Sequence, residues 1–211
     1  MYVPRHFSAE DLVELGAYMR TFKFAALITT VDATPYASHL PLVYDPAEGA
    51  FGTLYGHVAR ANSHWQSFAG ASDSLAIFTG PNAYVSPNWL AGGNAVPTWN
   101  YVAVHAYGRP QIVENEDQVL AILARLTGEN ETPKTGMWTA DKMDQTVLRG
   151  MLKGIVAFAM PVSRIEGKRK MSQNKPPEVQ QSAVAGLRQM QEPASTAVAD
   201  IMDVIQRENP A

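Results

Sequence analysis

Residues 96–110 carry the clearest hydrophobic and polar pattern of the chain, an alternation with a period of two. One face would hold Thr98, Asn100, Val102, Val104 and Ala106, and the other Trp99, Tyr101, Ala103, His105 and Tyr107. This alternation, rich in β-branched residues, predicts a strand. The second face is aromatic with polar tips, which is typical of a flat-ligand site or a subunit interface. An aromatic core strand of a barrel explains the same residues, so this segment alone leaves both interpretations open.

The rest of the chain predicts short strands with helices between some of them. Strands are predicted over residues 24–31, 36–44, 51–56, 74–80 with a continuation at 83–87, and 153–162. Helices are predicted over residues 8–20, 62–68, 116–126, 141–152 and 178–208, the last broken at Pro193. The short turns between the first three strands indicate an antiparallel meander, because parallel neighbours need long crossovers. The pattern favours a mainly β fold, a small antiparallel barrel with peripheral helices.

Two local signals refine these elements. Ser8 with Asp11 three residues later is typical of a capping box, so a helix is expected to begin at Ser8. Pro41 interrupts a predicted strand and removes a ladder donor, which indicates an edge or a bulge. A bulge would leave backbone groups free to meet a heteroaromatic ring, whereas a plain edge proline is the simpler explanation.

Composition and charge narrow the class of protein. The 211 residues suffice for one well-buried domain or one domain with a helical appendage. With 46% hydrophobic and 18% charged residues the chain is expected to be globular, and a net charge of −3 gives no general attraction to nucleic acid. The absence of cysteine excludes disulfides, a thiolate nucleophile and zinc–thiolate sites. No signal peptide or membrane span is evident, so a cytoplasmic location is expected.

A candidate anion site lies at residues 56–65, where a strand gives way to a helical pattern. Unpaired backbone N–H groups at a helix start, with the guanidinium of Arg60 beside them, suit a phosphate. Asn62 or Ser63 would be the N-cap. An ordinary capped helix with a solvent-facing Arg60 fits the same residues. No acidic cluster accompanies His57 and His64, so no metal site is predicted.

The only dense basic run covers residues 168–175. A surface patch explains it without any function, but its neutral part, Ser172-Gln173-Asn174, supplies donors that could hold phosphate or ring carbonyls beside Lys170. The sequence lacks Gly-x-Gly-x-x-Gly, Walker-type and Gly-x-Ser-x-Gly motifs, and no acid–base dyad stands out. Any chemistry would therefore need a cofactor.

Taken together, these segments resemble the PaiB-type family of FMN-binding split-barrel proteins, which are described as negative transcriptional regulators. The matching stretches are Met1-Tyr2-Val3-Pro4 with His6-Phe7, and residues 39–41, 56–62, 80–87, 97–101, 108–110 and 170–174. They occur in the family's order over residues 1–187. Any one of them is weak evidence, whereas the combination is specific.

The resemblance implies a six-stranded antiparallel Greek-key split barrel over residues 1–176. It also implies a helical extension over residues 177–211, packed on the barrel or on a dimer partner. FMN would bind in the cleft between two subunits of a homodimer. The implied cofactor-binding residues are His39, His57, Arg60, Asn62, Trp99, Asn100, Tyr101, Lys170, Gln173 and Asn174. Among these, His57, Arg60 and Asn62 match phosphate ligands, and Trp99, Asn100 and Tyr101 would line the ring or the dimer seam.

The chain departs from the family pattern in three places. Ser63 stands where proline is common, the loop at residues 90–95 lacks basic residues, and Gln180-Gln181 replaces a more basic pair. The last two changes predict weaker contacts with anions or nucleic acid.

Three functions are compatible with the sequence. The first is an FMN-binding dimer with a regulatory output, and the second is a flavin-dependent oxidoreductase related to pyridoxamine-phosphate oxidase and flavin reductases. A flavin enzyme needs no titratable residue of its own, although His39, His57 or His105 could donate a proton. The third, a DNA-binding protein without flavin, ranks last, because the net charge is negative and no basic recognition helix is evident.

Overall fold

The computed structural model describes residues 1–70, 73–90 and 95–208. The departure expected in the loop at residues 90–95 falls mainly on residues 91–94, which lie outside the described residues. The chain divides into two compact units. Unit 1 comprises Met1–Leu15, Thr79–Val104 and Glu166–Ala211, and unit 2 comprises Gly16–Phe78 and His105–Ile165.

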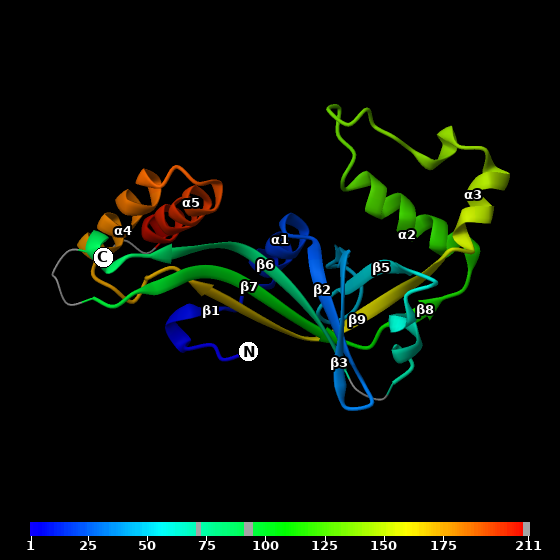
Figure 1. The fold of residues 1–211 in the computed structure, drawn as a ribbon, viewed down its shortest axis with the longest axis horizontal. Helices are drawn as coiled ribbons and strands as arrows, with labels where there is room; N and C mark the ends of the chain where they lie inside the picture. Colours follow the sequence, from blue (N-terminus) through cyan, green and yellow to red (C-terminus); the bar gives the residue numbers. More distant parts are fainter. Residues whose placement is uncertain (71–72, 91–94, 209–211) are drawn as a thin grey trace. The chain divides into compact units, whose positions relative to one another are not determined.

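The fold is mainly antiparallel β with helices, as predicted (Figure 1). The strands are β1 (Ser8–Ala9), β2 (Phe24–Val31), β3 (Thr34–Pro41), β4 (Val43–Asp45), β5 (Thr53–Ala59), β6 (Ser74–Val85), β7 (Thr98–Gly108), β8 (Gln111–Val113) and β9 (Ile155–Lys170). Their order is β3-β2-β6-β7-β9-β5-β4, with β1 and β8 also pairing with β9. The described residues thus form nine strands where six were expected, because β1 and β8 are short additions to β9 and one predicted strand is divided.

Within unit 2, the divided segment that contains β3 and β4 connects the two ends of the strand path. β3 pairs with β2 at one end of the path, and β4 pairs with β5 at the other end. Only Leu42 separates β3 from β4, so one continuous segment serves both ends. Pro41 is the last residue of β3, at the path's edge as predicted, and the N–H of Leu42 donates to the carbonyl of Lys23 at 2.9 Å. Because proline has no N–H, the β2 ladder can end here without an unpaired donor.

The predicted alternation along β7 is confirmed. Asn100, Val102, Val104 and Ala106 are buried, whereas Trp99 is 53% exposed and Tyr101, His105 and Tyr107 are half-buried. Ala103, which was expected on the aromatic face, is buried as well. One face of β7 therefore belongs to the core, and the other offers aromatic rings.

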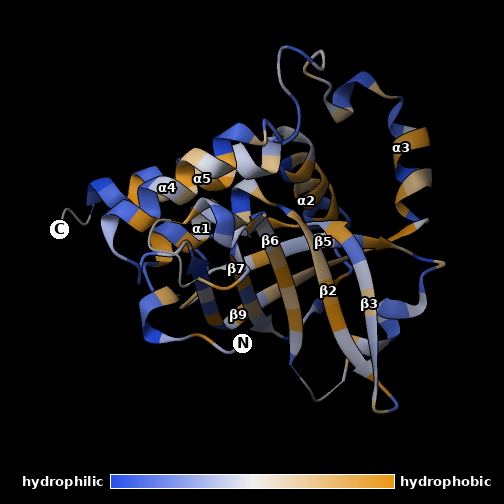
Figure 2. Ribbon diagram, turned by 60° about the vertical axis from the view of Figure 1, so that its left-hand side comes forward, coloured by the Kyte–Doolittle hydropathy of each residue, from blue (hydrophilic) through white to orange (hydrophobic). Residues whose placement is uncertain are grey.

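The helices are α1 (Leu12–Thr21), α2 (Glu116–Gly128), α3 (Gln145–Leu152), α4 (Pro177–Gln189) and α5 (Pro193–Glu208). Figure 2 shows hydrophobic and hydrophilic residues on different sides of α2, α4 and α5, which is typical of amphipathic helices. The break between α4 and α5 at Pro193 is confirmed. In the part of the chain that the structure describes, no helix is long and apolar enough to cross a bilayer.

The capping box predicted at Ser8 is wrong. Ser8 and Ala9 form β1 and pair with Lys168 and Gly167 of β9. The helix begins later, where the carboxylate of Asp11 accepts the N–H of Val13 at 2.8 Å. The residues that follow Ser8 do not indicate how far β9 extends, so the pairing of Ser8 with Lys168 could not be predicted from them.

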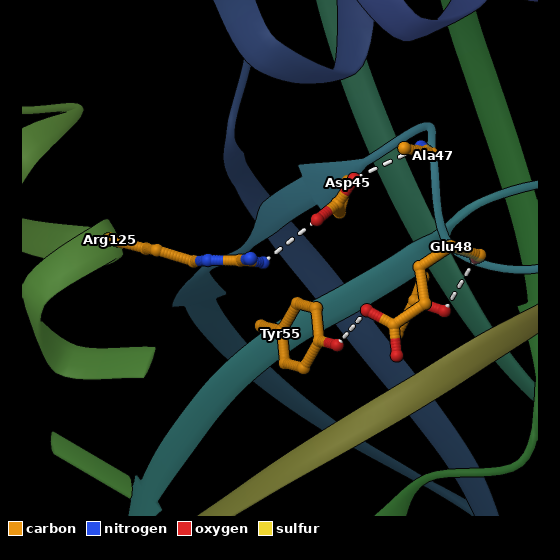
Figure 3. A network of polar contacts seen from close by, with 6 residues as sticks. Asp45, Ala47, Glu48, Tyr55 and Arg125 are labelled. Carbon is orange, nitrogen blue, oxygen red and sulfur yellow. Dashed lines mark hydrogen bonds and ion pairs between the residues drawn. The ribbon is translucent and has the colours of Figure 1, made fainter. Parts of the chain in front are cut away.

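Polar contacts fix α2 against β4 and β5 in unit 2 (Figure 3). Arg125 on α2 donates to Asp45 at 2.9 Å, and its guanidinium lies 5.3 Å from the centre of the Tyr55 ring. The Tyr55 hydroxyl in turn donates to Glu48. Burial and the neighbouring Glu48 carboxylate raise the pKa of Tyr55 to about 12, so this hydroxyl remains a donor at neutral pH. Beneath these contacts α2 packs apolar residues such as Ile122 against the strands.

Gly108, at the end of β7, provides a test of strand packing. An added Cβ would overlap the backbone carbonyl oxygen of Pro161 on β9. We expect Gly108→Ala to lower the free energy of unfolding by about 1–3 kcal/mol, because the backbone must shift. Urea unfolding measures this change.

Gly150→Ala is the matched control, since Gly150 lies in α3 with nothing within 4 Å of the added Cβ. This variant should be more stable by about 0.5–1 kcal/mol, because alanine favours a helix. Equal effects of the two substitutions would contradict the packing described for Gly108.

Candidate functional site

Asn62 connects β3 to the segment that follows β5 in unit 2. It is the N-cap of a 3₁₀ helix, Ser63–Ser67, and its Oδ1 accepts the N–H of His64 at 3.1 Å. Its Nδ2 donates to Ser38 Oγ at 2.9 Å, and the Tyr36 hydroxyl donates to its Oδ1 at 3.1 Å. Of the two predicted caps, Asn62 is the one observed. Its side-chain position is fixed from three sides.

His64 is the centre of a buried polar network that the sequence did not predict. The side chain is 1% exposed, with Nδ1 2.8 Å from Ser38 Oγ and Nε2 2.9 Å from Thr29 Oγ1. Thr29 Oγ1 lies 2.7 Å from Ser67 Oγ. Burial lowers the pKa of His64, so the ring is neutral at neutral pH. Among the described residues no group of three or more His, Cys, Asp or Glu side chains could hold a metal ion.

The guanidinium of Arg60 is held in a fixed orientation. Its Nε donates to the carbonyl of Lys153 at 2.8 Å and its Nη2 to that of Ile155 at 2.9 Å. The indole N–H of Trp65 donates to the carbonyl of Arg60 at 3.0 Å. The expected helix start is a 3₁₀ helix of five residues, which has little dipole to offer an anion. Any anion held here would therefore depend on Arg60.

The two remaining predicted residues of unit 2 are histidines on strands. His57 on β5 is half-buried, and the described residues give its Nδ1 no hydrogen-bond partner. Burial lowers the pKa of His57. His39 on β3 is exposed, and its ring stacks on Phe24 with the centroids 6.4 Å apart. The exposed ring of His39 is open to a further ligand, whereas Nδ1 of His57 is buried.

In unit 1, the start of β7 lies beside the turn that follows β9. The ammonium of Lys170 donates to the carbonyl of Trp99 at 2.6 Å and to the hydroxyl of Thr98. Ser172 Oγ donates to Asn100 Oδ1 at 3.0 Å. Burial, and then the nearby charge of Lys168, lower the pKa of Lys170. Two segments far apart in the sequence thus meet.

The side-chain polar groups of Asn100 and Gln173 form their hydrogen bonds within the protein. Asn100 is fully buried, and its Nδ2 lies 3.3 Å from the sulfur of Met202. Gln173 accepts the N–H of Met171 at 2.7 Å and donates to the carbonyl of Arg169 at 2.5 Å, which closes its own turn. These two amides position the backbone around them.

The other predicted residues of unit 1 are exposed or half-buried, so part of each side chain lies at the protein surface. Trp99 is largely exposed and packs edge-on against Tyr84, with the ring centroids 6.2 Å apart. Tyr101 is half-buried beneath the ammonium of Lys168, 5.2 Å from its ring centre, and Asn174 is exposed. The predicted site residues therefore form two groups. The group of unit 2 is His39, His57, Arg60 and Asn62, and the group of unit 1 is Trp99, Asn100, Tyr101, Lys170, Gln173 and Asn174.

The mainly antiparallel strand path, with aromatic side chains along β7, is typical of the class of split-barrel proteins. The family model described as "Putative FMN-binding domain" matches residues 1–164, and the chain belongs to this family. This membership confirms the predicted resemblance and FMN as the cofactor.

Relatives and solved structures agree with the assignment. The protease synthase and sporulation protein PAI 2 of Bacillus subtilis is 31% identical over 206 residues, which cover 96% of this chain and 97% of the relative. A solved structure of the flavocytochrome Anf3 from Azotobacter vinelandii matches with a TM-score of 0.62 at 12% identity, over 80% of this chain and 72% of that one. The FAD and heme binding protein from Mycobacterium smegmatis matches with a TM-score of 0.61 at 15% identity, over 85% and 80%. The structural likeness confirms the split-barrel fold.

The burial of His64 predicts a pH-dependent stability. Its lowered pKa means that the unfolded chain binds the proton more readily, so the free energy of unfolding should fall as the pH decreases below the ordinary histidine value of 6.5. Urea unfolding at about pH 7.5 and about pH 5.5 measures this loss.

His64→Gln should show a smaller loss of stability over the same pH interval, because the titrating group is gone. Burial lowers the pKa of His57 as well, so the pH dependence of the stability of His57→Gln is measured for comparison. An unchanged pH dependence in His64→Gln would contradict the role assigned to the buried ring.

Proposed function

We propose that this protein is an FMN-binding homodimer with a regulatory output. The observation that carries the proposal is the family match over residues 1–164. The proposal includes a flavin-binding domain over residues 1–176, a helical extension over residues 177–211 packed on the barrel or the dimer partner, and a cytoplasmic location. FMN supplies reversible redox chemistry when bound.

The residues of unit 2 fit the phosphate end of FMN. Arg60 has a guanidinium fixed by two carbonyls, so little conformational entropy is lost when its remaining donors meet an anion. His57 has a buried Nδ1 that lacks a partner among the described residues, so a phosphate contact would use the other ring nitrogen, Nε2. Together with the fixed amide of Asn62, this donor set suits a phosphate monoester.

The residues of unit 1 fit the flavin ring. Trp99 and Tyr101 offer flat aromatic surfaces, and Lys170 and Asn174 offer donors for ring carbonyls. Lys170 is already oriented by the carbonyl of Trp99. In this assignment Asn100 and Gln173 act as supports for that surface, and His39 would face the cofactor from β3.

Exposed aromatic side chains support the homodimer. Phe24 is 67% exposed beside His39 in unit 2, and Trp99 is exposed beside Tyr84 in unit 1. Rings of this size are enriched at subunit contacts, where they bury much area at low entropic cost. The proposal places FMN in the cleft between the two subunits.

A regulatory output is supported by the name of the Bacillus subtilis relative, a protease synthase and sporulation protein. The net charge of −3 argues against direct DNA binding as the main activity. A flavin-dependent oxidoreductase is the second candidate, and His57 favours it. In that case the half-buried ring of His57, which is neutral at neutral pH because burial lowers its pKa, would accept a proton beside the flavin instead of contacting the phosphate.

The full chain tests the whole proposal in three measurements. A flavin absorbance spectrum, with FMN identified by mass, supports cofactor binding, and a colourless protein with no thermal shift on adding FMN contradicts it. Sedimentation distinguishes a dimer from a monomer. Bleaching of the flavin by NAD(P)H at a catalytic rate would favour the oxidoreductase, and salt-sensitive binding to duplex DNA would restore the DNA-binding hypothesis.

Arg60→Ala should weaken FMN binding by roughly 1.5–3 kcal/mol, the usual cost of a lost charge-assisted contact. Quenching of flavin fluorescence during a titration measures the dissociation constant. Arg149→Ala is the control, because Arg149 is an exposed arginine on α3 that pairs with Glu116 and is not among the predicted site residues. An FMN affinity in Arg60→Ala equal to that of the control would remove Arg60 from the site.

A further inference from the structure

Unit 2 contains a cavity whose lining includes none of the predicted FMN residues. Its volume is about 300 Å³, and it lies between α2 and residues 137–140, with Leu148 of α3 at its edge. Leu120 and Leu123 line the α2 side, and Met137 and Trp138 line the opposite side. The cavity is within the range for small-molecule sites, at its lower limit.

The side opposite α2 is held in place by its own backbone. The carbonyl of Thr132 accepts the N–H groups of Thr135 at 3.0 Å, Gly136 at 3.2 Å and Met137 at 3.3 Å. This tight turn places Gly136 at φ +93° and Met137 at φ +51°. A non-glycine residue rarely adopts this left-handed conformation, and such residues are found at ligand clamps. The turn thus presents Met137 and Trp138 instead of letting them collapse onto α2.

Two charged groups beside this turn, Glu131 and Lys142, already form hydrogen bonds within it. The carboxylate of Glu131 accepts the backbone N–H of Trp138 at 2.8 Å and the hydroxyl of Thr135 at 2.6 Å. Lys142 donates to the carbonyl of Met137 at 2.8 Å. These bonds make the rim rigid, and the Glu131 carboxylate would repel an anion entering the cavity.

The side chains that line the cavity indicate which kind of ligand it can bind. Met137 is 52% and Trp138 38% exposed, so both large apolar side chains remain accessible to a ligand. A thioether and an indole both make favourable contacts with aromatic rings. Leucine side chains complete an apolar surface that has no spare charge to pair with an ionised group.

We propose that this cavity is a binding site for a small uncharged aromatic molecule of one or two fused rings. The proposed site does not depend on FMN, so a test of ligand binding here can give a positive or a negative result independently of the proposed function. A second copy of the chain is the alternative occupant, and the test separates the two.

Gly128 makes the test specific. It is the last residue of α2 and lines the cavity, and nothing lies within 4 Å of an added Cβ. Gly128→Phe should therefore fill open space without a clash. Gly150→Phe is the matched control, because Gly150 is also helical with nothing within 4 Å and does not line the cavity.

The experiment titrates the full chain with 2-naphthol and with the anionic analogue 2-naphthoate by calorimetry. We expect saturable binding of 2-naphthol, one per chain, at least tenfold weaker in Gly128→Phe and unchanged in Gly150→Phe. The naphthoate should bind at least tenfold more weakly than the naphthol. Absence of saturable binding, equal binding by Gly128→Phe, or a preference for naphthoate would overturn the proposal.

Two further measurements keep the result clear if Gly128→Phe fails to fold. In the unmodified protein, the indole N–H resonance of Trp138, assigned with Trp138→Phe, should shift with 2-naphthol while those of Trp65 and Trp89 stay in place. An unshifted Trp138 resonance would overturn the proposal. A change of oligomeric state in folded Gly128→Phe, measured by sedimentation, would instead assign this surface to a contact between copies.

Discussion

The passage of the chain from β3 to β4 at Leu42 is the constraint on which unit 2 depends. Pro41 ends the pairing with β2, and Leu42 enters the core with its N–H bonded to Lys23, so the next residues can pair with β5. Gly56 on β5 accommodates this passage, because a Cβ there would lie 2.7 Å from Leu42 Cδ2. One extended segment thereby holds both ends of the strand path, and a bulkier residue at position 56 would force them apart.

The same passage positions the polar residues of the candidate site. Ser38 lies on β3 shortly before the crossing, and its hydroxyl contacts both Asn62 and His64. A buried histidine is costly unless both ring nitrogens find partners, and Ser38 and Thr29 supply them from paired strands. The network therefore ties the residues after β5 to the β2–β3 hairpin. The exposed ion pairs of α2 and α3 contribute far less, because water screens them.

Much of the fold could be predicted from the sequence, and the failures have physical causes. The apolar, β-branched run over residues 24–31 predicted β2 with its observed bounds, and the period-two pattern identified the buried face of β7. The predicted strand at residues 153–162 ends too early, since the observed strand extends to Lys170. Arg164 and Lys168 interrupt the apolar pattern, but their charged groups lie over the rings of Tyr107 and Tyr101. Ser8 was expected to begin a helix because Ser8 and Asp11 have the spacing of a capping box, whereas its partner lies in the unpredicted part of β9.

The sequence by itself determined the strand and helix types, the edge position of Pro41 and, through motifs in a fixed order, membership of an FMN-binding family. These properties depend on local spacing and on residue identity. Only the tertiary structure decided that Arg60 is held by the carbonyls of Lys153 and Ile155, that His64 is buried between Ser38 and Thr29, and that Asn100 is a core amide. Such contacts join residues far apart in the chain, and single hydroxyls and carbonyls leave no pattern in the sequence that reveals their partners.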